Sequence, residues 1–381
     1  MSAKSWSRGC GDGVIALGWS RIQPSEERGV PVETSDVVVD VGSVPRSPAT
    51  RALDALGAAR LWRIRMFDNV LGNSWLADVA INRSKDTLRI IAYHGVPDLD
   101  AFDRQIALLL ARFVAVDEAT VRSWLAGEDE LRGPSVWVTF DDGEHSAVVG
   151  AAEALARRGI RPTVFVCPGF IDGGGGAGSL PWWSVVADAI DSGRDVRVDG
   201  ITYSDHRAVT ALKRVPDPVR RDVVAGLGVT DALRRRPTVT VDDLRRWIDL
   251  GGSIGNHTWD HPCLDRCSEV EQRSQVDRAA TWLTDLGLWD SRAFAYPNGD
   301  WTATVEAHLR AEGYGSVALF DHRLCRRSSH PTRLSRLRLE AGVDARRTMA
   351  VASGLNPMAF HLREALRGRS ANSPLAGGPC S

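Results

Sequence analysis

Two adjacent carboxylates, Asp141 and Asp142, follow a short apolar segment at residues 136–140 and precede Gly143. The valines and the phenylalanine of that segment favour extended structure, and the Asp-Asp-Gly sequence ends it. Two carboxylates side by side repel each other unless a cation lies beside them. A metal ion would bind one carboxylate and leave the other free to move protons. The same residues also fit an ordinary strand followed by an Asp-Gly turn.

Two histidines four residues apart, His257 and His261, could supply further metal ligands. In the zinc-protease motif this spacing places both imidazoles on one face of a helix, but Thr258 stands where that motif needs glutamate. Gly255 and Pro262 flank the pair. We therefore expect a loop or a single turn here, rather than the protease helix.

Asp142, His257 and His261 are the predicted ligands of a divalent metal ion, for which zinc is favoured. Two neutral imidazoles and one carboxylate leave an open coordination position on zinc, as catalytic sites do. A polar loop whose histidines are satisfied by hydrogen bonds is the simpler alternative. A third interpretation is a structural zinc site of the two histidines with Cys263 and Cys267, although their spacing does not match the common finger patterns.

The elements that must position these side chains alternate between strands and helices. Apolar runs of strand length recur at residues 88–93, 136–140, 162–166, 293–296, 315–320 and 334–339. Segments with helical spacing or helix-capping residues lie between them, at residues 102–113, 146–158, 240–250, 268–286 and 302–312. Repetition of strand, loop and helix predicts a parallel α/β fold.

Composition narrows the class of protein. The 381-residue chain has 43% hydrophobic and 25% charged residues, which is typical of a soluble globular protein. Its formal net charge of -1 gives no electrostatic reason to bind nucleic acid or an anionic membrane. The six cysteines lie far apart, which favours reduced thiols over a disulfide framework. Because residues 1–23 lack a signal peptide and no integral membrane segment is evident, we predict a cytoplasmic protein.

Three motifs together resemble the polysaccharide deacetylases, that is, carbohydrate esterase family four with its NodB-homology domain. They are Thr-Phe-Asp-Asp-Gly at residues 139–143, the His257 and His261 pair, and Phe-Ala-Tyr-Pro-Asn-Gly at residues 294–299. They occur in the order of the family, and residues 91–96 look like the start of one branch of it. The resemblance covers about residues 88–339. It implies a distorted, incomplete (β/α) barrel, usually described as seven-stranded.

This resemblance, together with the sequence pattern, predicts the domain organisation. Residues 1–85 are expected to be a partly disordered N-terminal extension, because they lack clear periodicity. Residues 86–345 would form the deacetylase barrel, with an insertion at about 170–238. Residues 346–381 are expected to form a C-terminal helix and a flexible tail.

The resemblance also assigns roles in the hydrolysis of an N-acetyl group on an amino sugar. Asp142 and the two histidines would hold the cation, and Asp141 would be the general base. The backbone N–H of Asn298 would stabilise the oxyanion. His94 is the candidate general acid, because the late segment at residues 334–340 has no histidine. His94, Asp141 and Asn298 each follow a predicted strand, so a parallel barrel would bring them to one mouth.

Two departures from the family pattern concern the catalytic groups. Ala295 stands where the family often has an arginine that contacts the base aspartate, although Arg292 is nearby. Asn298 stands where a tyrosine is usual. The insertion could also roof the site, and its Trp182 and Trp183 could stack on a sugar, although core packing is the simpler role for at least one of them.

The sequence thus predicts a metal-dependent hydrolase that deacetylates an amino sugar in an oligo- or polysaccharide or in its lipid-linked precursor. Alternatives are an O-acetyl esterase or a deformylase or amidase of the same fold, and a catalytically inactive carbohydrate-binding protein. The expected partner is a carbohydrate substrate, and the sequence identifies no protein partner.

Overall fold

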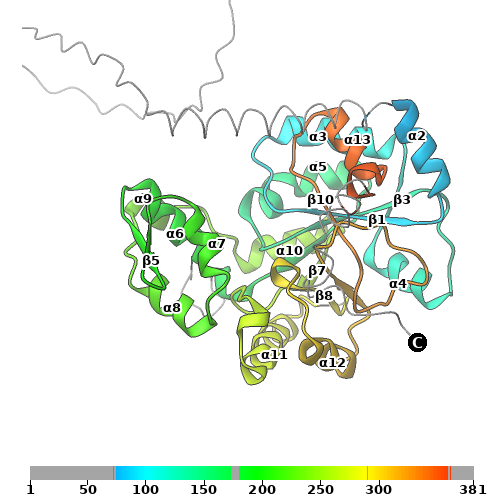
Figure 1. Ribbon diagram of the computed structural model, residues 1–381. Coiled ribbons are helices and arrows are strands. Elements are labelled where there is room, and N and C mark those ends of the chain that lie inside the picture. The colour runs from blue at the N-terminus through cyan, green and yellow to red at the C-terminus, as the bar shows by residue number, and fades with distance from the viewer. Residues whose placement is uncertain (1–71, 73, 173–179, 290, 359–360, 362–381) are drawn as a thin grey trace, which may run out of the picture. The chain divides into compact units, whose positions relative to one another are not determined.

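A computed structural model describes residues 72, 74–172, 180–289, 291–358 and 361 (Figure 1). Of the predicted N-terminal extension, residues 72 and 74–85 are described and include a helix at Ser74–Arg83, whereas residues 1–71 and 73 fall outside the described residues. Of the predicted C-terminal helix and flexible tail at residues 346–381, residues 359–360 and 362–381 also fall outside them. The glycine-rich start of the predicted insertion, residues 173–179, does so as well. Within the described part, no helix has both the length and the apolar character needed to cross a membrane.

A curved parallel sheet forms the centre of the molecule. Its main path within the described residues runs in the order β10-β1-β3-β4-β7-β8-β9, and β2 pairs with β3 beside this path. The strands are β1 (Leu88–Tyr93), β2 (Val114–Val116), β3 (Ser135–Phe140), β4 (Thr163–Val166), β7 (Ser253–Asn256), β8 (Ala293–Ala295), β9 (Ser316–Ala318) and β10 (Leu337–Arg338). This seven-stranded path confirms the predicted distorted barrel.

The end of the barrel segment closes the sheet onto its first strand. Leu334 forms a parallel bridge with Ala318 of β9, whereas Leu337 pairs with Ile91 of β1. The segment therefore changes its partner strand midway along its length. This change explains why β10 comprises only Leu337–Arg338, although the alternating pattern predicted a strand over residues 334–339.

Alternation along the strands separates an inner from an outer layer. Small and large apolar residues fill the barrel interior: Leu88, Ile90, Trp137, Phe165, Ala293, Ala295, Ala318 and Leu334. The intervening residues of β1, β3 and β4 face outward and pack against helices in a second core. The Trp137 indole donates to Thr163 Oγ1 at 3.0 Å, so its buried N–H is satisfied.

Helices cover the outside of the sheet (Figure 1). They are α2 (Ser74–Arg83), α3 (Leu99–Leu110), α4 (Glu118–Ala126), α5 (Ala152–Arg157), α10 (Val241–Asp249), α11 (Glu269–Asp285), α12 (Ala303–Ala311) and α13 (Ala345–Ala352). Helix α10 begins with a full capping box, in which Thr240 and Asp243 satisfy each other's backbone N–H groups.

The helix predicted at residues 146–158 begins differently from expectation. Its first part, Ser146–Ala151, is a π-helix, and α5 follows directly. Ser146 Oγ accepts a hydrogen bond from the Val96 N–H at 2.8 Å. The start of this helix therefore holds the loop that follows β1 and carries His94, which agrees with the frequent occurrence of π-turns near functional sites.

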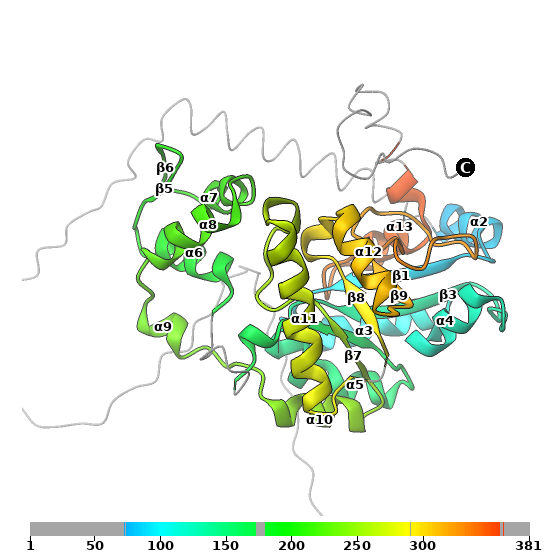
Figure 2. The ribbon, with the colours of Figure 1, turned by 90° about the horizontal axis from the view of Figure 1, so that it is seen from below.

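Between β4 and α10 lies a group of elements with its own hydrophobic cluster (Figure 2). It comprises α6 (Trp182–Asp191), β5 (Val196–Val198), β6 (Ile201–Tyr203), α7 (Arg207–Leu212), α8 (Asp217–Ala225) and α9 (Asp231–Arg234). Strands β5 and β6 form a separate antiparallel pair. We call residues 180–236 the inserted segment.

Candidate metal centre and catalytic pocket

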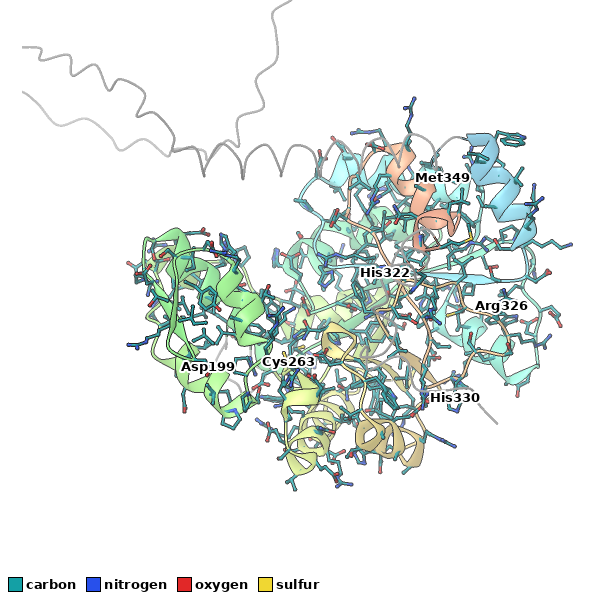
Figure 3. All side chains as sticks on the ribbon, viewed as in Figure 1. Asp199, Cys263, His322, Arg326, His330 and Met349 are labelled. Atoms are coloured by element: carbon teal, nitrogen blue, oxygen red, sulfur yellow. The ribbon has the colours of Figure 1, made fainter. Side chains whose placement is uncertain are left out.

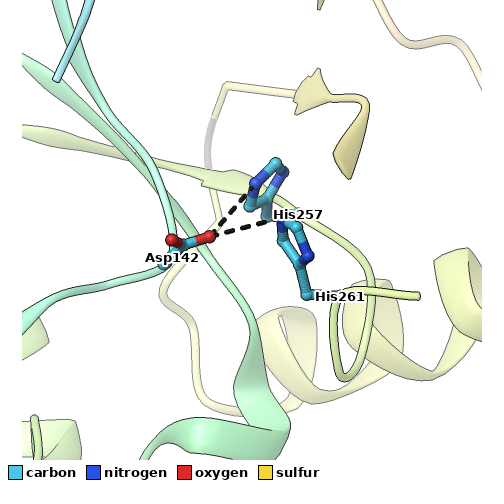
Figure 4. Close-up of side chains that lie close together, drawn as sticks. All are labelled: Asp142, His257 and His261. Atoms are coloured by element: carbon cyan, nitrogen blue, oxygen red, sulfur yellow. Dashed lines mark ion pairs between the residues drawn. The ribbon is translucent and has the colours of Figure 1, made fainter. Parts of the chain in front are cut away.

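Three predicted ligands meet at the carboxyl ends of β3 and β7 (Figure 4). Asp142 lies just after β3, His257 directly follows β7, and His261 lies in the loop beyond it. Asp142 Oδ1 is 3.5 Å from His257 Nε2 and 3.4 Å from His261 Nε2. One ligand atom from each of the three residues lies within 4.8 Å of the others. As expected, no helix contains the histidine pair.

The orientation of His257 suits metal binding. Its Nδ1 lies 2.7 Å from the Ala295 carbonyl oxygen, and because a carbonyl can only accept, Nδ1 carries the proton. Nε2 is thereby left with a lone pair that points toward Asp142. A hydrogen bond at one ring nitrogen that frees the other is the usual support of a metal-binding histidine.

The charge states and the unpaired atoms of the three predicted ligands suit a bound cation. Asp142 Oδ1 is buried and has no hydrogen-bond partner among the described residues. Burial would raise the pKa of Asp142, but the imidazoles of His261 and His257 counter it and hold that pKa well below its ordinary range. Burial lowers the pKa of His261 to about 3. An ionised carboxylate and a neutral imidazole are the forms that bind metal.

Backbone strain is concentrated around these ligands. Asp142, Thr258, His261 and Asn298 are non-glycine residues with positive φ, at 68°, 68°, 56° and 55°. Each such conformation costs about 1–2 kcal/mol unless neighbouring groups hold it. The His261 turn is held by hydrogen bonds, because the His261 N–H donates to Thr258 Oγ1 and its carbonyl accepts from Trp182 Nε1.

The base candidate Asp141 has a partner that the sequence did not reveal. Arg336 Nη1 donates to Asp141 Oδ1 at 2.6 Å, and Nη2 donates to Oδ2 at 2.9 Å. Arg336 Nε donates to the Leu319 carbonyl at 2.9 Å, and the Arg336 side chain is only 1% exposed. Arg292 does not take this role, since its guanidinium contacts the Glu312 carbonyl and the Trp289 ring. The signal available in the sequence was the alternating segment at residues 334–339, which places Arg336 and Arg338 on one face.

The Arg336 contact determines the charge of the base. Burial would raise the pKa of Asp141, but Arg336, with His257 and His94, outweighs burial and holds that pKa below its ordinary value. Asp141 is therefore ionised and fixed by two charge-assisted hydrogen bonds. An ionised carboxylate beside a metal centre is ready to accept a proton.

A pocket of about 390 Å³ brings the predicted catalytic residues to the metal ligands. Its walls include Asp141, Asp142, His261, His94 and Asn298. Further lining comes from Trp183, Ala187, Val209, Lys213, Tyr296, Gly299, Phe320, Arg336 and Arg338. The structure thus places residues from the ends of several strands around one opening, as expected for a parallel barrel.

The Asn298 side chain is bound at both of its ends. Its Oδ1 accepts from Lys213 Nζ at 2.5 Å, and its Nδ2 donates to Asp300 Oδ2 at 3.2 Å and to Cys263 Sγ at 3.6 Å. Among the hydrogen bonds of the described residues, none has the Asn298 backbone N–H as its donor. Because Asn298 also lines the pocket, its backbone N–H remains a candidate donor to an oxyanion there.

The alternative zinc site with two cysteines gains no support. Neither Cys263 nor Cys267 belongs to the cluster of possible metal ligands in the described chain. Figure 3 shows Cys263 on one side of the barrel, away from Arg326 and His330 in the loop before β10.

The two tryptophans of α6 have different positions. Trp182 is 5% exposed and donates from Nε1 to the His261 carbonyl at 3.2 Å. It therefore packs in the core and holds the loop that carries His261. The Trp183 ring lies 4.7 Å from the His261 ring and lines the pocket. Only Trp183 therefore offers a surface to a ligand.

Comparison with known proteins agrees with this site. Residues 229–317 match the polysaccharide deacetylase family, and this range includes His257, His261 and Asn298. The predicted resemblance to polysaccharide deacetylases is thereby confirmed. The match supports hydrolysis of amide bonds in carbohydrates as the class of reaction. No curated protein matches the chain.

Several solved structures are similar to the chain. They include the Streptococcus pyogenes deacetylase PplD in complex with acetate, with 16% identity and a TM-score of 0.49 over 70% of this chain and 99% of that one. IcaB from Ammonifex degensii has 19% identity and a TM-score of 0.46 over 70% and 97% of the two chains. The BpsB deacetylase domain from Bordetella bronchiseptica has 14% identity and a TM-score of 0.43 over 67% and 96%.

Proposed function

We propose that the protein is a metal-dependent hydrolase that removes the N-acetyl group from an amino sugar in an oligo- or polysaccharide or in its lipid-linked precursor. The observation that carries this proposal is the cluster of Asp142, His257 and His261, whose Asp142 and His261 line one pocket together with the Asp141–Arg336 pair. The family match supplies the class of substrate. Zinc fits the two imidazoles and one carboxylate.

When bound, a divalent cation would acidify water and polarise the acetyl carbonyl. Asp141 accepts the proton of the attacking water, and Arg336 keeps its carboxylate ionised and correctly oriented. The backbone N–H of Asn298 donates to the oxyanion that forms on the acetyl group. His94 then protonates the departing amine, because an amide anion is a very poor leaving group. Trp183 offers an apolar face to the sugar ring.

Metal content and acetate release together test this proposal. The purified protein should contain about one zinc or similar ion per chain and should release acetate from N-acetylglucosamine oligomers. His257→Ala should lose both the metal and the activity. Asp141→Asn is the matched control, because it should keep the metal and lose about 10²- to 10⁴-fold in activity.

Two outcomes would overturn the proposal. A fully metal-loaded protein that releases acetate from acetylated xylan, but from no acetamido sugar, would be an O-acetyl esterase. A protein that binds no metal after incubation with zinc would be a carbohydrate-binding protein on this scaffold. The cytoplasmic localisation stays a prediction, and fractionation of cells that express the full chain would test it.

A further inference from the structure

Two cations line the catalytic pocket in addition to the arginine that binds the base. Lys213 lies at the C-terminal cap of α7, in the inserted segment, and Arg338 lies on β10. Arg338 follows Arg336 by two residues, so both arginines point to the same side of the strand. Both Lys213 and Arg338 have exposed side chains, and are therefore accessible to a ligand in the pocket.

The carboxylates of the pocket do not neutralise these two cations. Asp141 and Asp142 are the only acidic residues in the described lining, and they are bound by Arg336 and by the histidine pair. Two carboxylates against three cations leave an excess positive charge, and a divalent ion would increase it. The Glu340 carboxylate is 3.8 Å from Arg338, but that pair is exposed and therefore weak.

Lys213 has donors left for a ligand. Its ammonium has three N–H groups, and the structure shows one of them bound to the neutral Oδ1 of Asn298. Asp300 contacts the other end of the same amide and does not line the pocket. The Lys213 ammonium therefore lies at the residue whose backbone N–H is the proposed oxyanion donor, and both residues line the pocket.

We propose that Lys213 and Arg338 select a substrate that carries an oxyanion, either a carboxylate or a phosphate, on the acetamido sugar or on the sugar next to it. This inference rests on the proposed function and specifies its substrate class. The apolar side chains of Trp183, Ala187 and Val209 line the same pocket and supply the surface for the sugar ring. Lys213 and Arg338 bind the oxyanion of the substrate, and the apolar side chains pack against its sugar ring.

The test compares kcat/KM for acetate release from three substrates. They are the neutral N-acetylglucosamine tetramer, a tetramer of alternating N-acetylglucosamine and N-acetylmuramic acid, and N-acetylglucosamine 6-phosphate. The wild type should prefer at least one of the two anionic substrates over the neutral one by about tenfold or more, and 0.5 M NaCl should reduce this ratio. The two anionic substrates distinguish a carboxylate from a phosphate as the recognised group.

Variants locate the source of the preference. Lys213→Met and Arg338→Met should each lower the ratio of anionic to neutral kcat/KM by about three- to tenfold, whereas Lys213→Arg should retain it. The ratio is the readout because Lys213 also contacts Asn298, so that its loss can affect both substrates equally. Lys85→Met and Arg197→Met, which remove exposed cations outside the pocket, are matched controls and should not change the ratio.

Two results would overturn this inference and leave the proposed function intact. If kcat/KM of the wild type for the neutral tetramer equals or exceeds kcat/KM for both anionic substrates, the enzyme does not select its substrate by charge. If the double variant of Lys213 and Arg338 keeps the wild-type ratio, these residues do not cause it. Absence of acetate from all three substrates would instead be a failure of the proposed function itself.

Discussion

Arg336 and Asp141 form a bidentate ion pair inside the barrel, although they are 195 positions apart in the chain. Replacement of Arg336 by Met should leave a buried carboxylate without its cation, which costs about 3–5 kcal/mol in the free energy of unfolding. It should also lower kcat by at least about tenfold, because the base is no longer fixed. Urea denaturation and acetate release measure the two effects. In the Asp141→Asn background, Arg336→Met should lower the free energy of unfolding by much less. An equal loss in both backgrounds would show that Arg336 and Asp141 are not energetically coupled.

The pH dependence should change in a defined direction. Asp141 has a lowered pKa in the folded protein, so the stability it contributes is present above the unfolded pKa and is lost as the pH falls through the folded value. Without Arg336, the folded pKa of Asp141 should rise, because only His257 and His94 then oppose the effect of burial. The acid limb of kcat/KM should therefore move to higher pH in Arg336→Met, and this variant should gain relative stability in mild acid. An unchanged acid limb would exclude Asp141 as the base.

His94 should matter only when the leaving group needs a proton. His94→Ala is expected to reduce deacetylation of N-acetylglucosamine oligomers by about 10²- to 10³-fold. The same variant should keep most of its activity on 4-nitrophenyl acetate, because a nitrophenolate leaves without protonation. Metal content is the control, since His94 is not among the three clustered ligands. Equal losses on both substrates would assign His94 to substrate or metal positioning instead.

Asn298 tests whether a backbone or a side-chain group stabilises the oxyanion. Both Asn298→Gly and Asn298→Ala keep the backbone N–H, so activity should remain within about tenfold of wild type if that N–H is the donor. The alanine variant should be less stable than the glycine variant by about 1 kcal/mol, because φ at this position is 55°. A loss of activity above about a hundredfold in the glycine variant would show that the amide side chain acts directly.

Gly255 lies on β7, two residues before the predicted metal ligand His257, and has no room for a side chain. A Cβ atom at this position would lie 2.4 Å from Phe165 Cδ1 and 3.2 Å from the Ala293 carbonyl oxygen. Gly255→Ala should therefore cost about 1–3 kcal/mol in the free energy of unfolding. It should also weaken zinc binding, because the Phe165 ring packs beside His257. Gly150→Ala is the matched control: nothing lies within 4 Å of its Cβ, so stability should stay constant or rise slightly.

The sequence predicted those parts of the site whose pattern lies within one short segment of the chain. Acidic residues at a strand end and two histidines four apart identified Asp142, His257 and His261 as candidates, and the repeated strand and helix pattern indicated a parallel barrel. Both signals depend on residues within one short segment, so they do not require knowledge of the tertiary structure.

The Arg336 contact could not be predicted in this way. Alternation placed Arg336 and Arg338 on one face of a strand, but it could not show which aspartate that face would meet. That information arises only when the segment pairs with both β9 and β1. Lys213 is a similar case, because it lies in an inserted segment without a recognisable motif and reaches Asn298 only through the tertiary fold.

The closing segment at residues 334–338 also sets the order in which the molecule can be completed during synthesis. A ribosome that adds about 5–20 residues per second makes Asp141 roughly 10–40 s before Arg336. Throughout that interval the β1 edge that later pairs with β10 lacks this partner, and β9 becomes a second unpaired edge for roughly the last 1–4 s. Unpaired strand edges are prone to join strands of other chains. The nascent protein is therefore exposed to aggregation until its last strand emerges, and that one strand covers both edges and completes the base at the same moment.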